Sequence, residues 1–154
     1  EVTGQRHQIE FQTTRAAMAG EWDSFRLERV IDNLLGNAIK YSPEDGRIIV
    51  RLEQARDEAG SWAVLEIQDF GLGIPAADLP LIFDEFHRGA NVLGRVPGMG
   101  LGLAGVRHIV DQHGGDVSVF SVEGAGATFT VRLPLPATTA AAEVPSEPTE
   151  AGCA

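Results

Sequence analysis

Polar side chains at helical spacing in an otherwise apolar segment could together bind a metal–phosphate group. Their intervals of four, three and one residues place them on one side of a helix, and they are Asn33, Asn37, Lys40 and Tyr41. An asparagine amide oxygen suits Mg²⁺, a lysine one turn later can meet a phosphate, and an aromatic ring can stack on a base. A solvated helix face would carry the same residues, and for this segment alone that interpretation is favoured.

A carboxylate followed by two glycines stands where a predicted strand ends. In the segment Asp69-Phe70-Gly71-Leu72-Gly73, the glycines allow a tight turn and the close approach of a ligand. A carboxylate at a strand end can accept a hydrogen bond from the exocyclic amine of adenine. An aspartate before a glycine turn is also common without any ligand, and for this segment alone that interpretation is favoured.

Alternating glycines open the last predicted helix. The segment Gly98-Met99-Gly100-Leu101-Gly102-Leu103 precedes an apolar pattern with helical spacing. Backbone N–H groups at a helix N-terminus attract anions, and the missing Cβ atoms let phosphates come close. We therefore expect this segment to bind phosphate rather than to be a glycine-rich loop without a function.

Residues 87–99, which lead into the second glycine cluster, are predicted to form a mobile lid. Phe83 and Phe86 could latch it against the core, and Arg88 and Arg95 could reach a polyphosphate. Two core aromatic residues and two solvated arginines would give the same local pattern. The local sequence leaves both interpretations open.

Three other nucleotide-binding motifs do not fit. Asp69-Phe70-Gly71 spells the Mg²⁺-binding tripeptide of protein kinases, but the chain is too short for that fold and its sole lysine lies on a predicted helix. The glycines at 100, 102 and 105 have the spacing of a dinucleotide-binding fingerprint, but residues 95–97 do not form the strand that must precede them. A P-loop is excluded because no Gly-Lys-Ser or Gly-Lys-Thr sequence is present.

Composition narrows the class of protein further. The chain has 154 residues, a net charge of -10 and one cysteine, Cys153. This acidity argues against nucleic-acid binding, and a lone cysteine excludes a disulfide framework or a cysteine-based metal site. No apolar run is long enough to span a membrane, so we expect a cytoplasmic domain without direct membrane contact. We also expect it to be part of a longer protein, in which any membrane anchor would lie outside these residues.

Hydrophobic periodicity predicts two helices. Apolar residues recur at helical spacing over 24–41, where Asp23 or Ser24 can cap the start and Pro43 stops the helix. A second such pattern covers 100–113, with Gly114 as its C-cap. The inward stripe of the first helix is predicted to comprise Leu27, Val30, Ile31, Leu34, Leu35, Ala38 and Ile39.

Alternating patterns predict the strands and, with the helices, the fold. The strands are expected at 7–12, where Ile9 and Phe11 would face inward, and at 47–53, 63–69, 117–119 and 127–133. This order predicts an α/β (α+β) two-layer sandwich, with a mixed, mostly antiparallel sheet of about five strands covered on one face by helices. We expect residues 1–135 to form this one domain, and the Ala-, Pro-, Thr- and Glu-rich residues 136–154 to be a disordered tail.

Taken in chain order, the motif segments resemble the histidine kinase branch of the ATPase superfamily that also includes gyrase, Hsp90 and MutL. Residues 33–42 resemble its N box, and Asp69-x-Gly71-x-Gly73 resembles its first glycine box. Phe83-x-x-Phe86 resembles its F box, and Gly98-x-Gly100-x-Gly102-Leu103 its second glycine box. Each box alone is weak, but the ordered set is specific, and the resemblance extends over roughly residues 7–135.

The resemblance implies that the domain binds ATP and Mg²⁺. Asn37 would bind Mg²⁺, Lys40 would contact phosphate, and Tyr41 would pack along an adenine whose amine donates to Asp69. The remaining residues of the implied nucleotide site are Gly71, Gly73, Ile74, Phe83, Arg88, Gly98, Gly100, Leu101, Gly102 and Leu103.

Asn33 bears on the reaction that the resemblance implies. In the ATP-hydrolysing relatives and the anti-sigma serine kinases, a glutamate at this position activates a water or a serine hydroxyl. Asparagine has no useful basicity, whereas a histidine acceptor already has a free nitrogen lone pair. The resemblance therefore implies phosphoryl transfer to a histidine, to which Asn33 and Lys40 would contribute by positioning and charge neutralisation.

No histidine of the chain has the flanking sequence of a phosphoacceptor; the four are His7, His87, His108 and His113. We expect the acceptor on a dimerisation helical hairpin outside this chain, so the isolated chain should bind ATP without autophosphorylating. That hairpin and the receiver domain of a response regulator are the implied partners.

Two other functions stay open. The first is a related serine kinase or a small ATPase, against which Asn33 argues. The second is a degenerate module that binds protein partners but no ATP, against which the presence of Asn37, Asp69 and the second-box glycines argues.

Overall fold

A five-stranded sheet forms one layer of the computed structural model, which describes residues 7–14, 17–43, 46–84 and 102–136. The strands lie in the order β1-β2-β3-β5-β4, and only β1 and β2 pair in parallel. Their bounds are β1 Gln8–Thr13, β2 Arg47–Asp57, β3 Gly60–Asp69, β4 Asp116–Val122 and β5 Gly126–Pro134. The predicted mixed, mostly antiparallel sheet is confirmed.

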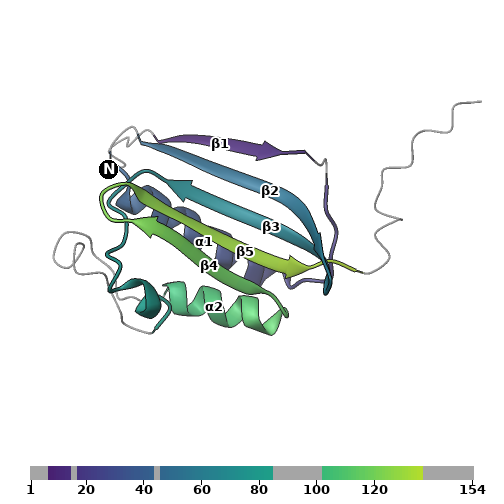
Figure 1. Ribbon diagram of the computed structural model, residues 1–154. Coiled ribbons are helices and arrows are strands. Elements are labelled where there is room, and N and C mark those ends of the chain that lie inside the picture. Colours follow the sequence, from purple (N-terminus) through teal and green to yellow (C-terminus); the bar gives the residue numbers. More distant parts are fainter. Residues whose placement is uncertain (1–6, 15–16, 44–45, 85–101, 137–154) are drawn as a thin grey trace, which may run out of the picture.

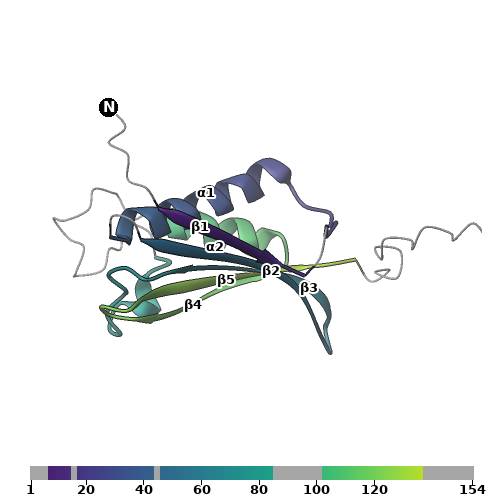
Figure 2. The same cartoon turned by 90° about the horizontal axis from the view of Figure 1, so that it is seen from above.

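Helices α1 (Ser24–Tyr41) and α2 (Gly102–Gln112) form the second layer, on one face of the sheet (Figures 1 and 2). A short 3₁₀ helix, η1 (Leu79–Leu81), precedes the F box and was not predicted. The core lies between the layers, and its most completely buried side chains are Leu34, Ile48, Ile67, Val30, Val106, Val110 and Val131. The two-layer sandwich predicted from the sequence is therefore confirmed.

Helix α1 has the bounds that its sequence predicts. The Asp23 side chain caps its start by accepting a hydrogen bond from the Arg26 N–H at 3.2 Å, and such a cap contributes about 1 kcal/mol. The helix ends at Tyr41, two residues before Pro43, because a residue that precedes proline disfavours helical backbone. The predicted inward stripe is wrong at Ile31, which is 43% exposed beside the buried Val30.

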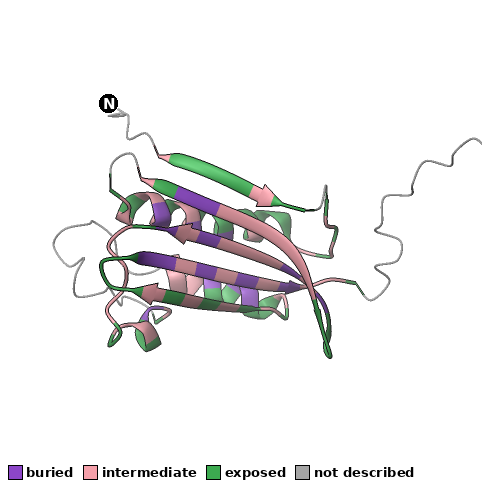
Figure 3. Ribbon diagram, turned by 45° about the horizontal axis from the view of Figure 1, so that its top comes forward, coloured by how far each residue is buried: buried purple, intermediate pink, exposed green. Residues whose placement is uncertain are grey.

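Strand β1 is less buried than its alternating sequence predicts. Ile9 and Phe11 are 51% and 60% exposed, and the strand appears as an exposed edge in Figure 3. Among the described strands, β1 pairs with β2 alone, and in Figure 1 the helices lie behind the other strands. Alternation predicts which side chains share a face, whereas coverage of that face depends on where the helices lie.

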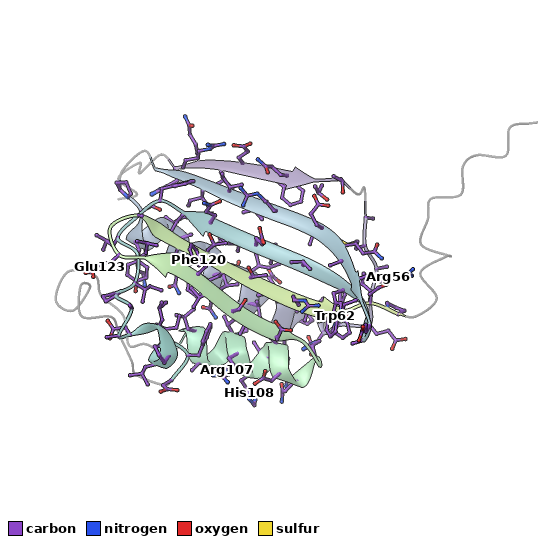
Figure 4. All side chains as sticks on the ribbon, viewed as in Figure 1. Arg56, Trp62, Arg107, His108, Phe120 and Glu123 are labelled. Atoms are coloured by element: carbon purple, nitrogen blue, oxygen red, sulfur yellow. The ribbon has the colours of Figure 1, made fainter. Side chains whose placement is uncertain are left out.

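The β2–β3 hairpin is longer than predicted. Strand β2 extends to Asp57 and β3 begins at Gly60, beyond the predicted ranges 47–53 and 63–69. The Asp57 carboxylate accepts hydrogen bonds from the N–H groups of Ala59 and Gly60 and from the Trp62 indole N–H. The Trp62 hydrogen bond and the Arg132 guanidinium hold the pKa of Asp57 below its ordinary value. The Arg132 guanidinium also lies over the Trp62 ring, 4.6 Å from its centroid. Figure 4 shows Trp62 at this end of the sheet.

Helix α2 ends at Gln112, one residue before the predicted end at 113, and the predicted cap Gly114 follows it. Gly114 has a φ of 74°, the left-handed conformation that a glycine C-cap supplies. The N–H groups of Gly114 and Gly115 donate to the carbonyls of Asp111 and Val110. Within the described ranges, no helix is long and apolar enough to cross a membrane.

Candidate nucleotide-binding site

Several motif segments meet at one end of the sandwich. The C-terminal end of α1, the end of β3, the β4–β5 turn and the start of α2 lie together there (Figure 1). These segments are far apart in the sequence, and the sheet order brings them together because β5 lies between β3 and β4. We therefore expect a ligand site at this end of the sandwich.

The N box touches the first glycine box through backbone atoms. The Leu72 N–H donates to the Tyr41 carbonyl at 3.2 Å. A Cβ atom at Gly71 would lie 2.0 Å from that same carbonyl oxygen, a distance at which no side chain fits. Glycine at position 71 thus allows the loop after β3 to close on the end of α1.

Asp69 is a buried carboxylate at the end of β3, with 6% of its surface exposed. It accepts a hydrogen bond from the Gly71 N–H at 2.9 Å, which holds the turn. Burial raises the pKa of Asp69, and hydrogen bonds from the N–H groups of Gly71 and Ala127 offset part of this rise. A carboxylate that is costly to bury, and has acceptor capacity left, is typical of a functional site.

Gly73 shapes the floor of the loop. Its φ is 68°, and a Cβ atom there would lie 2.2 Å from the Val122 carbonyl oxygen in the β4–β5 turn. Both facts require glycine, because other residues rarely adopt this conformation and none would fit the space. The glycine pattern after Asp69 therefore follows from two close backbone approaches, one to α1 and one to the β4–β5 turn.

The start of α2 lies against the N box. A Cβ atom at Gly102 would be 3.5 Å from Asn33 Oδ1, so the described part of the second glycine box faces the polar side of α1. Asn33 and Asn37 are half-buried on that side, and Lys40 is exposed near the end of the helix. The N box thus contacts both glycine boxes, as a pocket built from all three requires.

A hollow of about 360 Å³ lies between the end of α1 and the loop after β3. Its lining includes three residues of the predicted site, Lys40, Tyr41 and Gly71, and Phe70 follows Asp69 directly. Asn37 and Asp69 do not line it. The lining residues are Lys40, Tyr41, Ser42, Pro43, Phe70, Gly71 and Leu72.

Phe83 of the F box is packed into the fold. Its ring meets Phe129 edge-on at 6.3 Å between centroids, and the Arg107 guanidinium lies 5.9 Å above it. Phe83 is therefore packed between β5 and α2; whether it latches a lid stays a prediction. The sequence did not indicate Arg107, because an arginine on the polar side of a helix looks solvated until its aromatic neighbour is known.

Part of the predicted site lies outside the described residues. This holds for the predicted lid arginine Arg88, for Arg95, for Phe86 of the F box, and for Gly98, Gly100 and Leu101 of the second glycine box. Ile74 and Leu103 are described and half-buried, and both pack against the core.

Two of the described histidines lie on α2 or directly after it. His113 connects the two helices, since its Nε2 accepts the Asp23 N–H at 3.0 Å and its Nδ1 lies 2.8 Å from the Ile109 carbonyl. His108 is exposed on α2 (Figure 4). Among the described residues, no group of three or more His, Cys, Asp or Glu side chains could hold a metal ion. A metal at this site would need other ligands, such as an asparagine and phosphate oxygens.

A family model described as histidine kinase-, DNA gyrase B- and HSP90-like ATPase matches residues 22–137. The circadian input-output histidine kinase CikA of Thermosynechococcus vestitus is 41% identical over 130 residues, 84% of this chain and 17% of its own. The sensor histidine kinase WalK of Bacillus subtilis is 38% identical over 115 residues, 74% of this chain and 18% of its own. The chain thus spans less than a fifth of the length of these relatives.

Solved structures give the same likeness. The mycobacterial sensor histidine kinase MprB superposes with a TM-score of 0.69 at 36% identity, over 83% of this chain and 81% of that one. Full-length ShkA in complex with AMPPNP superposes with a TM-score of 0.69 at 27% identity, over 86% of this chain and 26% of that one.

Proposed function

Because this chain belongs to the histidine kinase-, DNA gyrase B- and HSP90-like ATPase family, we propose that it binds Mg·ATP and donates the γ-phosphoryl group to a histidine on a separate helical domain. The observation that carries the proposal is the meeting of three motif segments around one end of α1. Leu72 bonds to Tyr41, Gly102 lies against Asn33, and the buried Asp69 stands beside this junction.

The adenine would bind at the first glycine box. The Asp69 carboxylate accepts the exocyclic amine, and Tyr41 packs along the ring. The backbone of Gly71, Gly73 and Ile74 forms the floor, where the two close approaches described above leave no room for side chains. Adenine recognition would then rest on a buried acceptor, which discriminates strongly against a base that presents no donor there.

The triphosphate would extend from there toward the second glycine box. The residues present fit a bound Mg²⁺, because Asn37 supplies a neutral oxygen ligand half-buried on the polar side of α1. When bound, the ion neutralises part of the triphosphate charge. Lys40 meets phosphate oxygens, and the backbone of Gly98, Gly100, Leu101 and Gly102 would surround them at the start of α2, with Arg88 as a further contact.

The chemical step needs little from the protein beyond positioning. The imidazole nitrogen of the acceptor attacks the γ-phosphorus with its lone pair, the bond to the β–γ bridging oxygen breaks, and ADP leaves. No proton has to be removed from the attacking nitrogen, so the absence of a basic group at Asn33 does not impede the reaction. The same absence disfavours activation of a water, which separates transfer from hydrolysis.

The partners follow from this reaction. The acceptor histidine would lie on the dimerisation hairpin of the same protein, and a response-regulator receiver domain would take the phosphoryl group next. Sensor histidine kinases among the relatives extend far beyond the matched region, which supports a multi-domain setting on the cytoplasmic side, where ATP is available.

A mixing experiment with γ-labelled ATP tests the proposal. The purified chain is incubated with Mg·ATP and the phosphoacceptor hairpin of a related sensor kinase, beside a hairpin whose histidine is replaced. We expect acid-labile label on the intact hairpin, none on the replaced one, and none on the chain by itself. Label on the chain alone, or steady phosphate release without a hairpin, would replace this function with self-phosphorylation or with an ATPase.

A further inference from the structure

The hydroxyl of Ser121 joins the glycine-box loop to the end of the β4–β5 hairpin. Its oxygen accepts a hydrogen bond from the Ile74 N–H at 2.8 Å and donates one to the Gly126 carbonyl at 2.7 Å. Ser121 is half-buried near the end of β4, and one side chain thus bridges two backbone segments that are 52 residues apart. Replacement by alanine would leave both the N–H and the carbonyl without this partner.

Backbone contacts place the same loop against the same turn. The Gly124 N–H donates to the Leu72 carbonyl at 2.7 Å. A Cβ atom at Gly126, the first residue of β5, would lie 2.1 Å from the Asp69 carbonyl oxygen, so the hairpin also approaches the residue that precedes the loop. The turn carries Glu123 and follows Phe120, both labelled at this end of the molecule in Figure 4.

The loop over 70–74 has no helix or strand of its own, so its position depends on its neighbours. The end of α1 holds one side through the bond between Tyr41 and Leu72, and the β4–β5 turn holds the other. The Ser121 hydroxyl accepts the N–H of Ile74, the last residue of this loop. Ile74 packs against the hydrophobic core. A shift of Ile74 would therefore move the backbone that follows Asp69.

We propose that Ser121 is a positioning residue for nucleotide binding: its hydroxyl fixes the glycine-box loop on the β4–β5 hairpin, in the place where adenine would meet Asp69. This inference rests on the proposed function of the site. Ser121 touches no nucleotide; it acts through Ile74 and Gly126. Loss of the two part-buried hydrogen bonds through which Ser121 orders the loop corresponds to about a 10-fold weaker affinity.

The variants are Ser121→Ala, Ser121→Thr, which keeps the hydroxyl, and the matched control Ser118→Ala. Ser118 lies on the same strand, exposed on the other face, opposite Thr130. ATP and GTP are each titrated with Mg²⁺ into every variant. We expect Ser121→Ala to bind ATP about 10-fold more weakly and to lose part of its preference for ATP over GTP, with Ser121→Thr and Ser118→Ala close to the unmutated chain.

Hydrogen exchange at the Ile74 amide, measured without nucleotide, gives a second reading. We expect faster exchange in Ser121→Ala and unchanged exchange in Ser118→Ala. A folded Ser121→Ala with unchanged exchange and unchanged ATP preference would overturn the inference. If Ser121→Ala does not fold, Ser121→Cys, which weakens the hydrogen bonds, takes its place in both measurements. Failure of the unmutated chain to bind ATP would instead reject the proposed function, while the exchange at Ile74 still decides whether Ser121 holds the loop.

Discussion

Replacing Asp69 with asparagine is expected to weaken ATP binding and, at the same time, to stabilise the nucleotide-free fold at neutral pH. The two side chains have the same shape, and the asparagine amide oxygen can still accept the Gly71 N–H. The substitution removes a negative charge from a side chain that is 6% exposed. It also places an NH₂ donor where the carboxylate offered a second acceptor.

The binding loss follows from the proposed contact with adenine. A hydrogen bond to a charged group contributes about 1.5–3 kcal/mol, and asparagine would turn an NH₂ group toward the adenine amine. We therefore expect ATP affinity to fall by roughly 10- to 100-fold. Asp32→Asn is the matched control, because Asp32 is exposed on α1 and its change should leave ATP affinity unaltered.

The stability gain follows from the raised pKa of Asp69. Since burial raises this pKa above its ordinary value of 3.8, the folded chain binds the proton more tightly than the unfolded chain. The charged side chain therefore lowers the free energy of unfolding at every pH above its folded pKa, and this cost disappears as the pH falls toward 3.8. Asparagine has no such cost, so its advantage is greatest at neutral pH.

Thermal melts from pH 7 downward, with and without Mg·ATP, measure both effects. We expect Asp69→Asn to melt above the unmutated chain at pH 7 without nucleotide, and the two curves to converge as the pH falls. With Mg·ATP, only the unmutated chain should gain a large increase in melting temperature. ATP affinity unchanged by Asp69→Asn would refute the assigned contact, and a lower melting temperature at pH 7 would refute the argument from burial.

Three further substitutions test the fold around the site. Gly73→Ala should cost at least about 2 kcal/mol of unfolding free energy and weaken ATP binding. Alanine is unfavourable at the φ of this position, and its Cβ atom would meet the Val122 carbonyl. Urea unfolding and ATP titration measure the two effects. Leu34→Ala should cost about 2–5 kcal/mol in urea unfolding, because it opens a cavity in the core, and the exposed Ile31→Ala should cost under about 1 kcal/mol; equal costs would contradict the helix orientation. Asp57→Ala should lower the melting temperature at neutral pH. The difference in melting temperature from the unmutated chain should disappear as the pH falls below 3.8 and through the lowered pKa of folded Asp57. A difference that does not depend on pH would exclude the Asp57 carboxylate as its cause.

The sequence predicted helices and strands correctly where capping residues or proline mark their ends. Helix α1 was predicted with its observed bounds, because Asp23 caps its start and Pro43 follows its end. Strand β1 was predicted as a strand, but its burial was not, because alternation does not reveal where the helices stop. The extension of β2 to Asp57 was missed for a similar reason, since this end of the hairpin is exposed and needs no hydrophobic pattern.

The sequence predicted the motifs of the candidate site and their order. It did not predict the neighbouring residues that hold these motifs in place. The glycines at 71 and 73 were expected to allow a tight turn and the close approach of a ligand. In the structure they accommodate the backbone carbonyls of Tyr41 and Val122, which the sequence did not indicate. Ser121 was not indicated, although it continues the inward alternation of Val117 and Val119 on β4. A hydroxyl at an inward position near a strand end is the signal that could have revealed it. The role of each site residue stays a prediction.

Calorimetric titration of Mg·ATP into the unmutated chain tests the central claim most directly. The account predicts saturable binding at one site, lost in large part in Asp69→Asn and made independent of Mg²⁺ in Asn37→Ala. The absence of binding by the folded chain would contradict it and would indicate a module that binds protein partners instead of nucleotide.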